Sequence, residues 1–302
     1  MAERALPEFG SENLDHCVLC GRTGRQDLRW SRLLALQPPY AALACPDCGL
    51  RWLSPRPDSA GYLKLYSDEN YFGGRGAAPE DYATLAKARR PYFATRIESI
   101  ERHFSPGKLA MLDYGAATGE FVALARERGH ACDGVELSDD ARAVALSRHG
   151  IDLLPADAAT AMSEAVYDVV HMNHVLEHMP DPLAQLRWCA KVLKPGGLLV
   201  AEVPQQFDND LDKARRAIGI GGRQSRFDAY SLHHTFFFTP RSMRTLAEKA
   251  GFSPVRIATF NPAKTPLWPF SLRNWILRPW LGAADKIRSG GNIVELYAAK
   301  MP

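Results

Sequence analysis

Four cysteines lie in two C-x-x-C pairs, a spacing that is typical of a metal site. Cys17 and Cys20 form the first pair, Cys45 and Cys48 form the second, and a glycine follows each pair. Each pair places two thiolates on one tight turn, and two such turns supply the tetrahedral set of four sulfur ligands that zinc prefers. Because this set leaves no coordination position open, we expect a structural zinc ion rather than a catalytic one. The alternative, a redox pair, is usually a single C-x-x-C near a βαβ pattern.

The stretch LAMLDYGAATGE, from Leu109 to Glu120, has the pattern of a strand, a tight turn and a helix. The apolar run ends at Asp113, and a helical spacing of apolar residues begins after Glu120. The turn is rich in small residues, and these are Gly115, Ala116, Ala117 and Gly119. Small residues let a ligand approach the backbone, and the start of a helix offers unpaired N–H groups to it. We therefore expect a bulky polar ligand here, although neither a complete G-x-G-x-x-G nor a P-loop is present.

The composition is that of an ordinary soluble globular protein. The chain has 302 residues, of which 46% are hydrophobic and 24% are charged, which gives room for about two domains. The formal net charge of +3 is too small to indicate a polyanionic partner. The N-terminal stretch lacks the apolar segment of a signal peptide, and no apolar run approaches the roughly 20 residues of a membrane span. Since metal-binding cysteine pairs also suit a reducing compartment, we expect a cytoplasmic protein.

Strand and helix patterns alternate through the middle of the chain. Strands are expected at 109–112, 131–137, 151–154, 167–172 and 198–203, and helices are expected from Glu120, at Asp139–His149 and at Pro182–Leu193. A helical pattern at Tyr82–Phe104 precedes them, and a helix at Pro240–Ala250 and strands at Val255–Phe260 and Asn292–Lys300 follow. Such alternation implies an α/β fold, a parallel sheet with helices on both faces, whose ligands bind at the carboxyl ends of the strands.

Three segments carry a resemblance to a known family. The G-x-A-x-G turn after Asp113 resembles motif I of the class I S-adenosylmethionine (SAM)-dependent methyltransferases, with Ala117 where a second glycine is usual. The segments N-H-V-L-E-H from Asn173 and L-K-P-G-G-L-L from Leu193 look like the group that contains ubiquinone-biosynthesis O-methyltransferases and many sugar methyltransferases. Together with the cysteine pairs, the chain resembles the zinc-ribbon sugar methyltransferases. The resemblance implies a Rossmann-like, seven-stranded class I methyltransferase domain preceded by a small zinc-ribbon domain.

The resemblance also implies a set of SAM-binding residues at the strand ends. Glu136, with Leu137 beside it, closes the second strand, where an acid can accept hydrogen bonds from both ribose hydroxyls. Asp157 and Ala158 follow the third strand at the position that meets the adenine, and Asn173 follows the fourth, beside the methionine part. The turn residues Asp113, Gly115, Ala116, Ala117 and Gly119 complete this set. Tyr71 belongs to an aromatic segment that either covers the cofactor or packs the two domains together.

Two histidines are candidates for the catalytic base on the acceptor side. His234, followed by Phe238 and Thr239, matches the family's His, three residues, Phe, Ser/Thr pattern, in which the sugar C-methyltransferases use the histidine as base. His178 is the second candidate. A hydroxyl acceptor needs a base within hydrogen-bond reach, and histidine has a suitable pKa. Alternatively, His234 is a hydrogen-bonded polar residue under a lid, and His178 braces the pocket. No open metal site is evident, which disfavours a magnesium-dependent mechanism.

The chain is expected to divide into a zinc ribbon at 1–60, a linker and helical segment that covers the cofactor at 61–104, and the methyltransferase domain at 105–302. The domain contains two insertions. The first, 205–232, is either a substrate lid or a plain insertion. The second, 261–290, is rich in tryptophan and basic residues, and its part 268–281 could make a peripheral membrane contact, a dimer contact or a roof over the active site.

These features predict a SAM-dependent methyltransferase that acts on a small molecule, a sugar or a glycan, most simply at oxygen. Sugar C-methylation is an alternative, although the chain is short for the further C-terminal domain of the enzymes that carry it out. A ribosomal RNA guanine N-methyltransferase is another, since one such family also has a zinc ribbon. It would require a basic ribbon, whereas residues 1–60 hold seven arginines against seven acids and no lysine. A third is a SAM-binding protein without turnover. The oligomeric state is not readable from the sequence.

Overall fold

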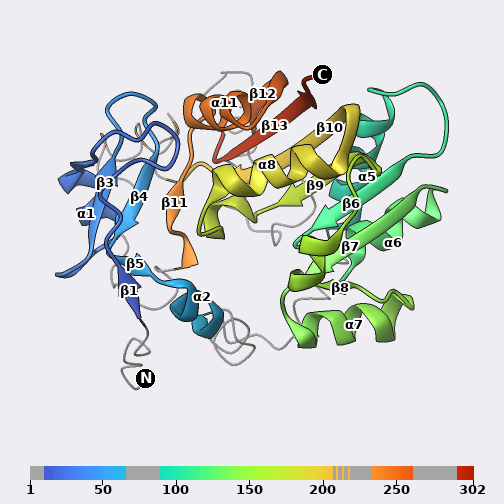
Figure 1. Ribbon diagram of the computed structural model, residues 1–302, viewed down its shortest axis with the longest axis horizontal. Coiled ribbons are helices and arrows are strands. Elements are labelled where there is room, and N and C mark those ends of the chain that lie inside the picture. Colours follow the sequence, from blue (N-terminus) through green and yellow to red (C-terminus); the bar gives the residue numbers. More distant parts are fainter. Residues whose placement is uncertain are drawn as a thin grey trace.

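A seven-stranded sheet forms the centre of the larger part of the protein (Figure 1). The computed structural model describes residues 10–65, 89–206, 209, 213, 217, 233–260 and 291–302. The strand order is β12-β13-β10-β9-β6-β7-β8, and only β13 runs antiparallel to its neighbours. The strands are β6 (Ala110–Tyr114), β7 (Ala131–Glu136), β8 (Leu154–Pro155), β9 (Tyr167–Asn173), β10 (Leu193–Pro204), β12 (Phe252–Phe260) and β13 (Ile293–Lys300). The predicted α/β fold of the Rossmann-like class I type is therefore confirmed.

Both faces of the sheet are apolar and buried. Successive side chains along a strand point to opposite faces, and each face belongs to a different hydrophobic core. The residues that enter one core are Met111, Val169 and Leu198, and those that enter the other are Leu112, Val170 and Leu199. Helices α5 (Arg90–Glu101), α6 (Glu120–Glu127) and α7 (Asp139–His149) contribute to the first core, and α8 (Pro182–Val192) and α11 (Pro240–Lys249) contribute to the second. Since strand residues alternate between faces, neighbouring apolar positions of one strand serve both layers of helices.

Two of the predicted elements differ in extent from what the apolar pattern indicates. The strand expected at 151–154 is present only as β8, because Ile151 and Leu153 are buried in the core without joining the ladder. The strand expected at 198–203 begins earlier, at Leu193, with a shift of register between Leu193 and Leu198 where the Pro-Gly-Gly sequence lies. The helix expected at 82–104 is described only from Arg90. No helix in the described ranges is long and apolar enough to cross a membrane.

The N-terminal part contains a small sheet around the four cysteines. Its elements are β1 (Ser11–Glu12), β2 (Arg25–Gln26), α1 (Leu28–Leu33), β3 (Ala41–Ala44), β4 (Arg51–Ser54), β5 (Arg56–Pro57) and α2 (Ser59–Leu65). The sheet has the order β11-β4-β3-β2, and its edge strand β11 (Phe236–Phe237) comes from the C-terminal half of the chain. The sheet of the ribbon is therefore completed by a strand from beyond the predicted ribbon boundary, a pairing that the sequence did not reveal.

The four cysteines are placed as ligands of one zinc ion. Their sulfur atoms all lie within 4.8 Å of one another, and those of Cys17 and Cys48 are 3.7 Å apart. Zinc–sulfur bonds of about 2.3 Å in a tetrahedron put neighbouring sulfur atoms about 3.8 Å apart, so the observed spacing fits the metal. Each knuckle closes through a glycine with positive φ, Gly21 and Gly49, whose N–H group donates to the carbonyl of the first cysteine of its pair. The group could therefore hold the predicted structural zinc.

We expect one zinc ion per chain, held by these four thiolates. Replacement of one ligand, Cys45→Ser, should lower the zinc content of the purified protein from about one equivalent to near zero, because a closed site depends on its complete ligand set. Metal content can be measured by inductively coupled plasma mass spectrometry. Cys132→Ser and Cys189→Ser are matched controls, since both cysteines are buried elsewhere and lie outside the cluster. Full zinc content in Cys45→Ser would contradict the assignment.

Candidate active site

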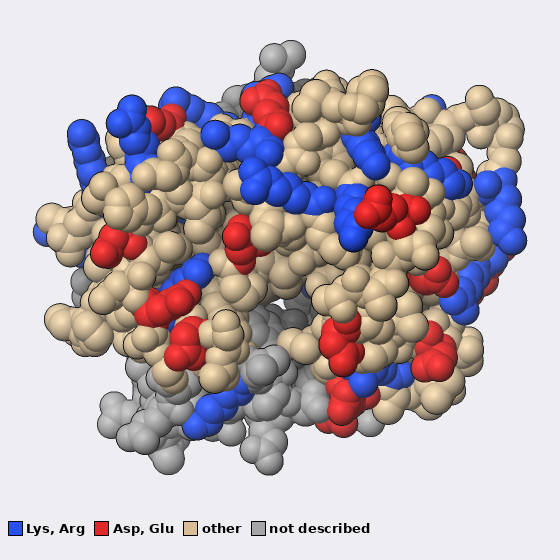
Figure 2. All heavy atoms as spheres, viewed as in Figure 1, with Lys and Arg blue, Asp and Glu red and all other residues tan. Residues whose placement is uncertain are grey.

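A cavity of about 710 Å³ lies at the carboxyl ends of β6, β7 and β9. Figure 2 shows the face of the molecule hollowed near its centre, between the ribbon and the side that carries α7. The cavity is lined by the turn after β6, the end of β7, the segment after β9, part of α2, and His234 from the stretch before β11. Its volume is in the range typical of small-molecule and cofactor sites. Ligands of parallel sheets bind at this edge, so the place agrees with the expectation from topology.

The turn after β6 adopts a backbone that few residue types tolerate. Gly115 has φ of +79°, and a Cβ atom there would lie 2.5 Å from Val175. Gly119 has φ of +78° and is the N-cap of α6. Ala117, which stands where the family usually has glycine, also has a positive φ of +48°. A left-handed alanine costs about 1–2 kcal/mol, so the turn keeps the glycine-like conformation in spite of the substitution.

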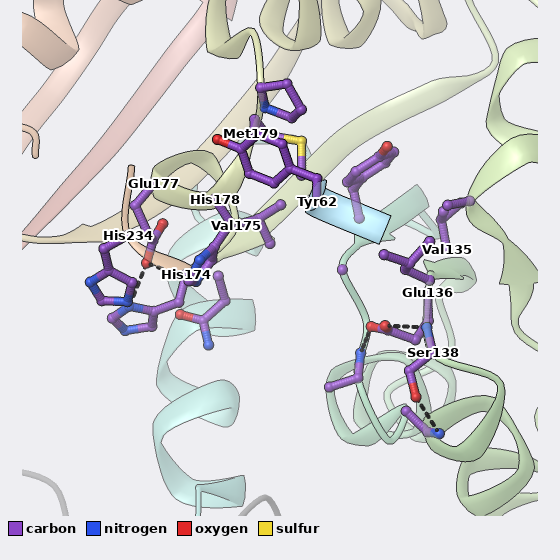
Figure 3. Close-up of a pocket in the computed structure, with 18 of the residues that line it drawn as sticks. Tyr62, Val135, Glu136, Ser138, His174, Val175, Glu177, His178, Met179 and His234 are labelled. Atoms are coloured by element: carbon purple, nitrogen blue, oxygen red, sulfur yellow. Dashed lines mark hydrogen bonds and ion pairs between the residues drawn. The ribbon is translucent and has the colours of Figure 1, made fainter. Parts of the chain in front are cut away.

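Glu136 is held at the rim of the cavity by two backbone groups. Its carboxylate accepts hydrogen bonds from the Ala117 N–H at 2.7 Å and from the Ser138 N–H at 2.9 Å (Figure 3). Burial raises the pKa of Glu136, and the hydrogen bonds from the backbone act in the opposite direction. Each carboxylate oxygen can accept more than one hydrogen bond. The Glu136 carboxylate therefore has capacity for further hydrogen bonds beside the turn.

The structure brings together a part of the predicted cofactor set. The predicted residues that line the cavity are Gly115, Ala117, Glu136, Leu137, Asn173, His178 and His234. Ala156 lines it instead of Asp157 or Ala158, both of which lie in the turn η1 (Ala156–Ala161). Ala116 and Gly119 belong to the turn and do not line the cavity, since Ala116 is buried and Gly119 is the N-cap of α6. Tyr71 and most of the insertions 205–232 and 261–290 lie outside the described residues. The roles of all these residues in cofactor binding stay predictions.

Asp113 faces the core rather than the cavity. It is buried, and its carboxylate lies 2.7 Å from Nδ1 of His171 on the neighbouring strand β9. Burial lowers the pKa of His171, so the neutral ring donates its Nδ1 hydrogen to Asp113. The ring also stacks on Phe121, with centroids 3.9 Å apart. Asp113 therefore supports the turn indirectly, by tying the end of β6 to β9 and α6.

The histidine side of the cavity is built from two distant segments. His178 lies after β9, and its Nδ1 donates a hydrogen bond to the His233 carbonyl at 2.7 Å. The rings of His178 and His234 meet edge to face, with centroids 4.8 Å apart. Burial lowers the pKa of His178 to about 3, so this ring is neutral and is a weak base. His234, whose Nδ1 lies 3.0 Å from Gln206 Oε1, is therefore the better candidate for accepting a proton.

A third group joins the two histidines. Ligand atoms of Glu177, His178 and His234 lie within 4.8 Å of one another, and Glu177 Oε2 is buried without a hydrogen-bond partner. These three residues could hold a divalent cation. No open metal site was evident in the sequence, and this group was not identified there, because His234 is far from Glu177 in the sequence and no short motif links them.

Sequence reasoning missed several contributors to the cavity, among them Ser59, Tyr62 and His174. Ser59 and Tyr62 of α2 line the cavity; Ser59 lies at the end of the segment expected to be the ribbon, and Tyr62 lies at the start of the segment expected to cover the cofactor. His174 lies between two carboxylates, with Nδ1 3.2 Å from Glu177 and Nε2 3.1 Å from Glu202. Its positive φ of +57° is rare for a residue other than glycine. Only its place directly after Asn173 could have drawn attention to it.

Known proteins share both the sequence pattern and the fold. A family model described as a methyltransferase domain matches residues 84–257, more than half of the chain. Ubiquinone biosynthesis O-methyltransferases are similar over part of it. That of Stutzerimonas stutzeri is 30% identical over 109 residues, which cover 34% of this chain and 47% of the relative. That of Cereibacter sphaeroides is 34% identical over 119 residues, which cover 39% and 46%. The chain thus spans about half the length of these curated relatives.

Two solved structures have the same fold at low sequence identity. The phosphoethanolamine N-methyltransferase 2 of Haemonchus contortus, in complex with S-adenosyl-L-methionine, has a TM-score of 0.54 at 19% identity and covers 83% of this chain and 64% of its own. A SAM-dependent methyltransferase of Archaeoglobus fulgidus has a TM-score of 0.50 at 19% identity, with 72% and 99% covered. The fold, the cavity at the strand ends and the match to the family model show that this protein belongs to the methyltransferase domain family.

Proposed function

We propose that the protein is a SAM-dependent methyltransferase that methylates a hydroxyl oxygen of a small molecule. The observation that carries the proposal is that one cavity holds Glu136 at one end and the pair His178 and His234 at the other. The first end suits the ribose of the cofactor, and the second suits an acceptor whose proton must be removed. The names of the ubiquinone-biosynthesis relatives support transfer to oxygen. A sugar or a glycan is the acceptor class to test first, because the chain resembles the zinc-ribbon sugar methyltransferases.

The residues that line the cavity are compatible with SAM. Under this proposal, one end of the cavity binds the cofactor and the other end binds the acceptor. SAM, when bound, supplies the activated methyl group. The turn after β6 lets the ligand lie against the backbone at Gly115, and Glu136 accepts hydrogen bonds from its hydroxyl groups. Asn173 lies beside His174 on the same wall. With Nδ1 of His234 bonded to Gln206, the proton of the acceptor goes to Nε2. The protein otherwise has to align the reacting atoms and exclude water.

The first experiment is transfer of labelled methyl from SAM into a fractionated cell extract. Small molecules, lipid-linked glycans and RNA are separated, and the wild type is compared with His234→Ala. Label in the small-molecule or glycan fraction that is lost in the variant supports the proposal. Label in RNA favours the ribosomal RNA alternative, and SAM binding without label in any fraction favours a binding protein without turnover. Mass spectrometry of the labelled product then separates transfer to oxygen from transfer to carbon.

For the cofactor end, we expect Glu136→Ala to weaken SAM binding by about 1–3 kcal/mol, the range for a lost hydrogen bond to a charged group and for polar groups left unsatisfied. Isothermal titration calorimetry measures the change. Glu164→Ala is the matched control, because Glu164 is an exposed acid of the same domain that pairs only with exposed Lys191. Equal affinity of Glu136→Ala and the wild type would remove Glu136 from the cofactor site.

For the acceptor end, we expect His234→Ala to lower kcat by about 100-fold or more, with SAM affinity retained, because general base catalysis contributes about 10²–10⁴-fold. Steady-state kinetics with the identified acceptor and calorimetry with SAM measure the two quantities. A comparable loss in His178→Ala alone, with normal turnover in His234→Ala, would reverse the assignment. Turnover that requires added magnesium or manganese after dialysis would instead point to a cation held by Glu177 and the two histidines.

A further inference from the structure

The ribbon is joined to the acceptor side of the cavity by backbone pairing. Strand β11 pairs with the ribbon strand β4, with Phe236 opposite Trp52 and Phe237 opposite Arg51. One residue earlier, the Thr235 carbonyl accepts a hydrogen bond from the Leu53 N–H at 3.0 Å. Figure 1 shows β11 beside β4, between the ribbon and the large sheet. The residue directly before this paired segment is His234, so the ribbon holds the chain next to the candidate base.

Thr235 also binds helix α2 and the segment after β9. Its N–H group donates to the Glu177 carbonyl at 3.1 Å, and its hydroxyl accepts a hydrogen bond from the Tyr62 hydroxyl at 2.8 Å. The side chain is completely buried and does not line the cavity. Burial raises the pKa of Tyr62 to about 12, so its hydroxyl stays protonated and donates. Thr235 therefore connects three parts of the molecule: the ribbon, helix α2 and the segment that carries His178.

The cysteine cluster is continuous with this connection. The second knuckle leads directly into β4, and the Cys45 N–H donates to the carbonyl of Leu50, the residue directly before that strand. Cys45, Cys48, Leu50 and Trp52 belong to the same buried core as Phe236 and Phe238. A second bond runs across the same junction, from the Arg241 side chain of α11 to the carbonyl of Asp47, between the two cysteines. Without the metal, the turn at Cys45–Cys48 would lose its ligand bonds, and the start of β4 would be less firmly held.

Among the residues that the structure describes, the groups that hold the cofactor end do not come from the ribbon. Glu136 is held by the backbone of Ala117 and Ser138, and the turn after β6 is held by the carbonyl of Val135. All of these groups belong to the large domain. The two ends of one cavity are thus supported by different parts of the chain.

We propose that Thr235 is a positioning residue through which the zinc ribbon sets the place of His234. Zinc in the cysteine cluster holds β4 in position, and β4 holds β11 in position through strand pairing. Thr235, which is hydrogen-bonded to β4, then fixes the position of the adjacent His234. The ribbon then controls turnover without controlling cofactor binding. This proposal rests on the proposed function for its kinetic consequence, but the coupling between zinc and His234 is a structural property that can be measured without turnover.

The test uses full-length protein and three variants. Thr235→Val removes the hydroxyl with little change of volume, and Thr235→Ser restores it. Thr245→Val is the control, because Thr245 is a half-buried residue of α11 whose hydroxyl donates to the Arg241 carbonyl of the same helix. We expect Thr235→Val to lower kcat by about 10- to 100-fold, since a displacement of about 1 Å can cost 10²-fold. KM for SAM, SAM affinity and zinc content should stay within about 2-fold of the wild type. Thr235→Ser should regain most of the activity.

Removal of zinc from the wild type is the second arm. A chelator should lower kcat at least as far as Thr235→Val does, SAM affinity by calorimetry should be retained, and added zinc should restore turnover. The side-chain nitrogen signals of His234 in NMR spectra, assigned with a His234→Asn variant, should shift on zinc removal and in Thr235→Val, but not in Thr245→Val. If the wild type has no turnover, the proposed function fails and these signals still test the coupling.

Three outcomes would overturn the proposal. Unchanged kcat and unchanged His234 signals in both Thr235→Val and the zinc-free protein would show that the ribbon does not act on the base. Loss of SAM binding in parallel with kcat would show that the ribbon supports the whole domain instead. Recovery of activity by neither Thr235→Ser nor added zinc would show that the losses came from irreversible unfolding rather than from position.

Discussion

The parallel pairing of β6 with β7 on one side and β9 on the other is the interaction on which both ends of the cavity depend. Parallel strands end at the same edge of a sheet, so the three segments that follow them are forced into one place. The turn after β6 and the acid at the end of β7 meet there through the bond from Ala117 to Glu136. The segment after β9 meets the same turn, because Val175 packs against Gly115 at a distance that only glycine permits.

The histidine side needs a constraint that the sheet does not supply. His178 is positioned by the chain that leaves β9, whereas His234 arrives on the stretch between β10 and α11. The His233 carbonyl and Thr235 hold that stretch on either side of His234, the first against His178 and the second against Glu177 and Leu53. Backbone hydrogen bonds have narrow geometry, so the small ribbon can hold a distant side chain in a defined position without touching it.

The sequence predicted the features that depend on local pattern. The strands and helices from Leu109 to Pro204 follow from apolar periodicity, and the four cysteines were recognised from their spacing alone. The pairing of β11 with β4 was not predictable. Phe236 and Phe237 lie in a short apolar run, and nothing in the sequence indicates which strand such a run pairs with. Asp113 was expected near the cofactor, but its burial against His171 depends on the register of β6 and β9. The register between two strands is a property of the tertiary structure, and it cannot be read from a single sequence.

Helix α2 contributes to the wall of the cavity. Methyl transfer from a sulfonium to a neutral acceptor is helped by a dry site in which polar groups are already oriented. Tyr62 lines the cavity together with Met179 (Figure 3), and its hydroxyl donates a hydrogen bond to Thr235, which is buried and does not line the cavity. The Tyr62 hydroxyl is therefore paired with a buried protein group, while Tyr62 remains part of the cavity wall. Because the same hydrogen bond also holds Thr235, one contact both supports this wall and, under the proposal made above, helps to position His234.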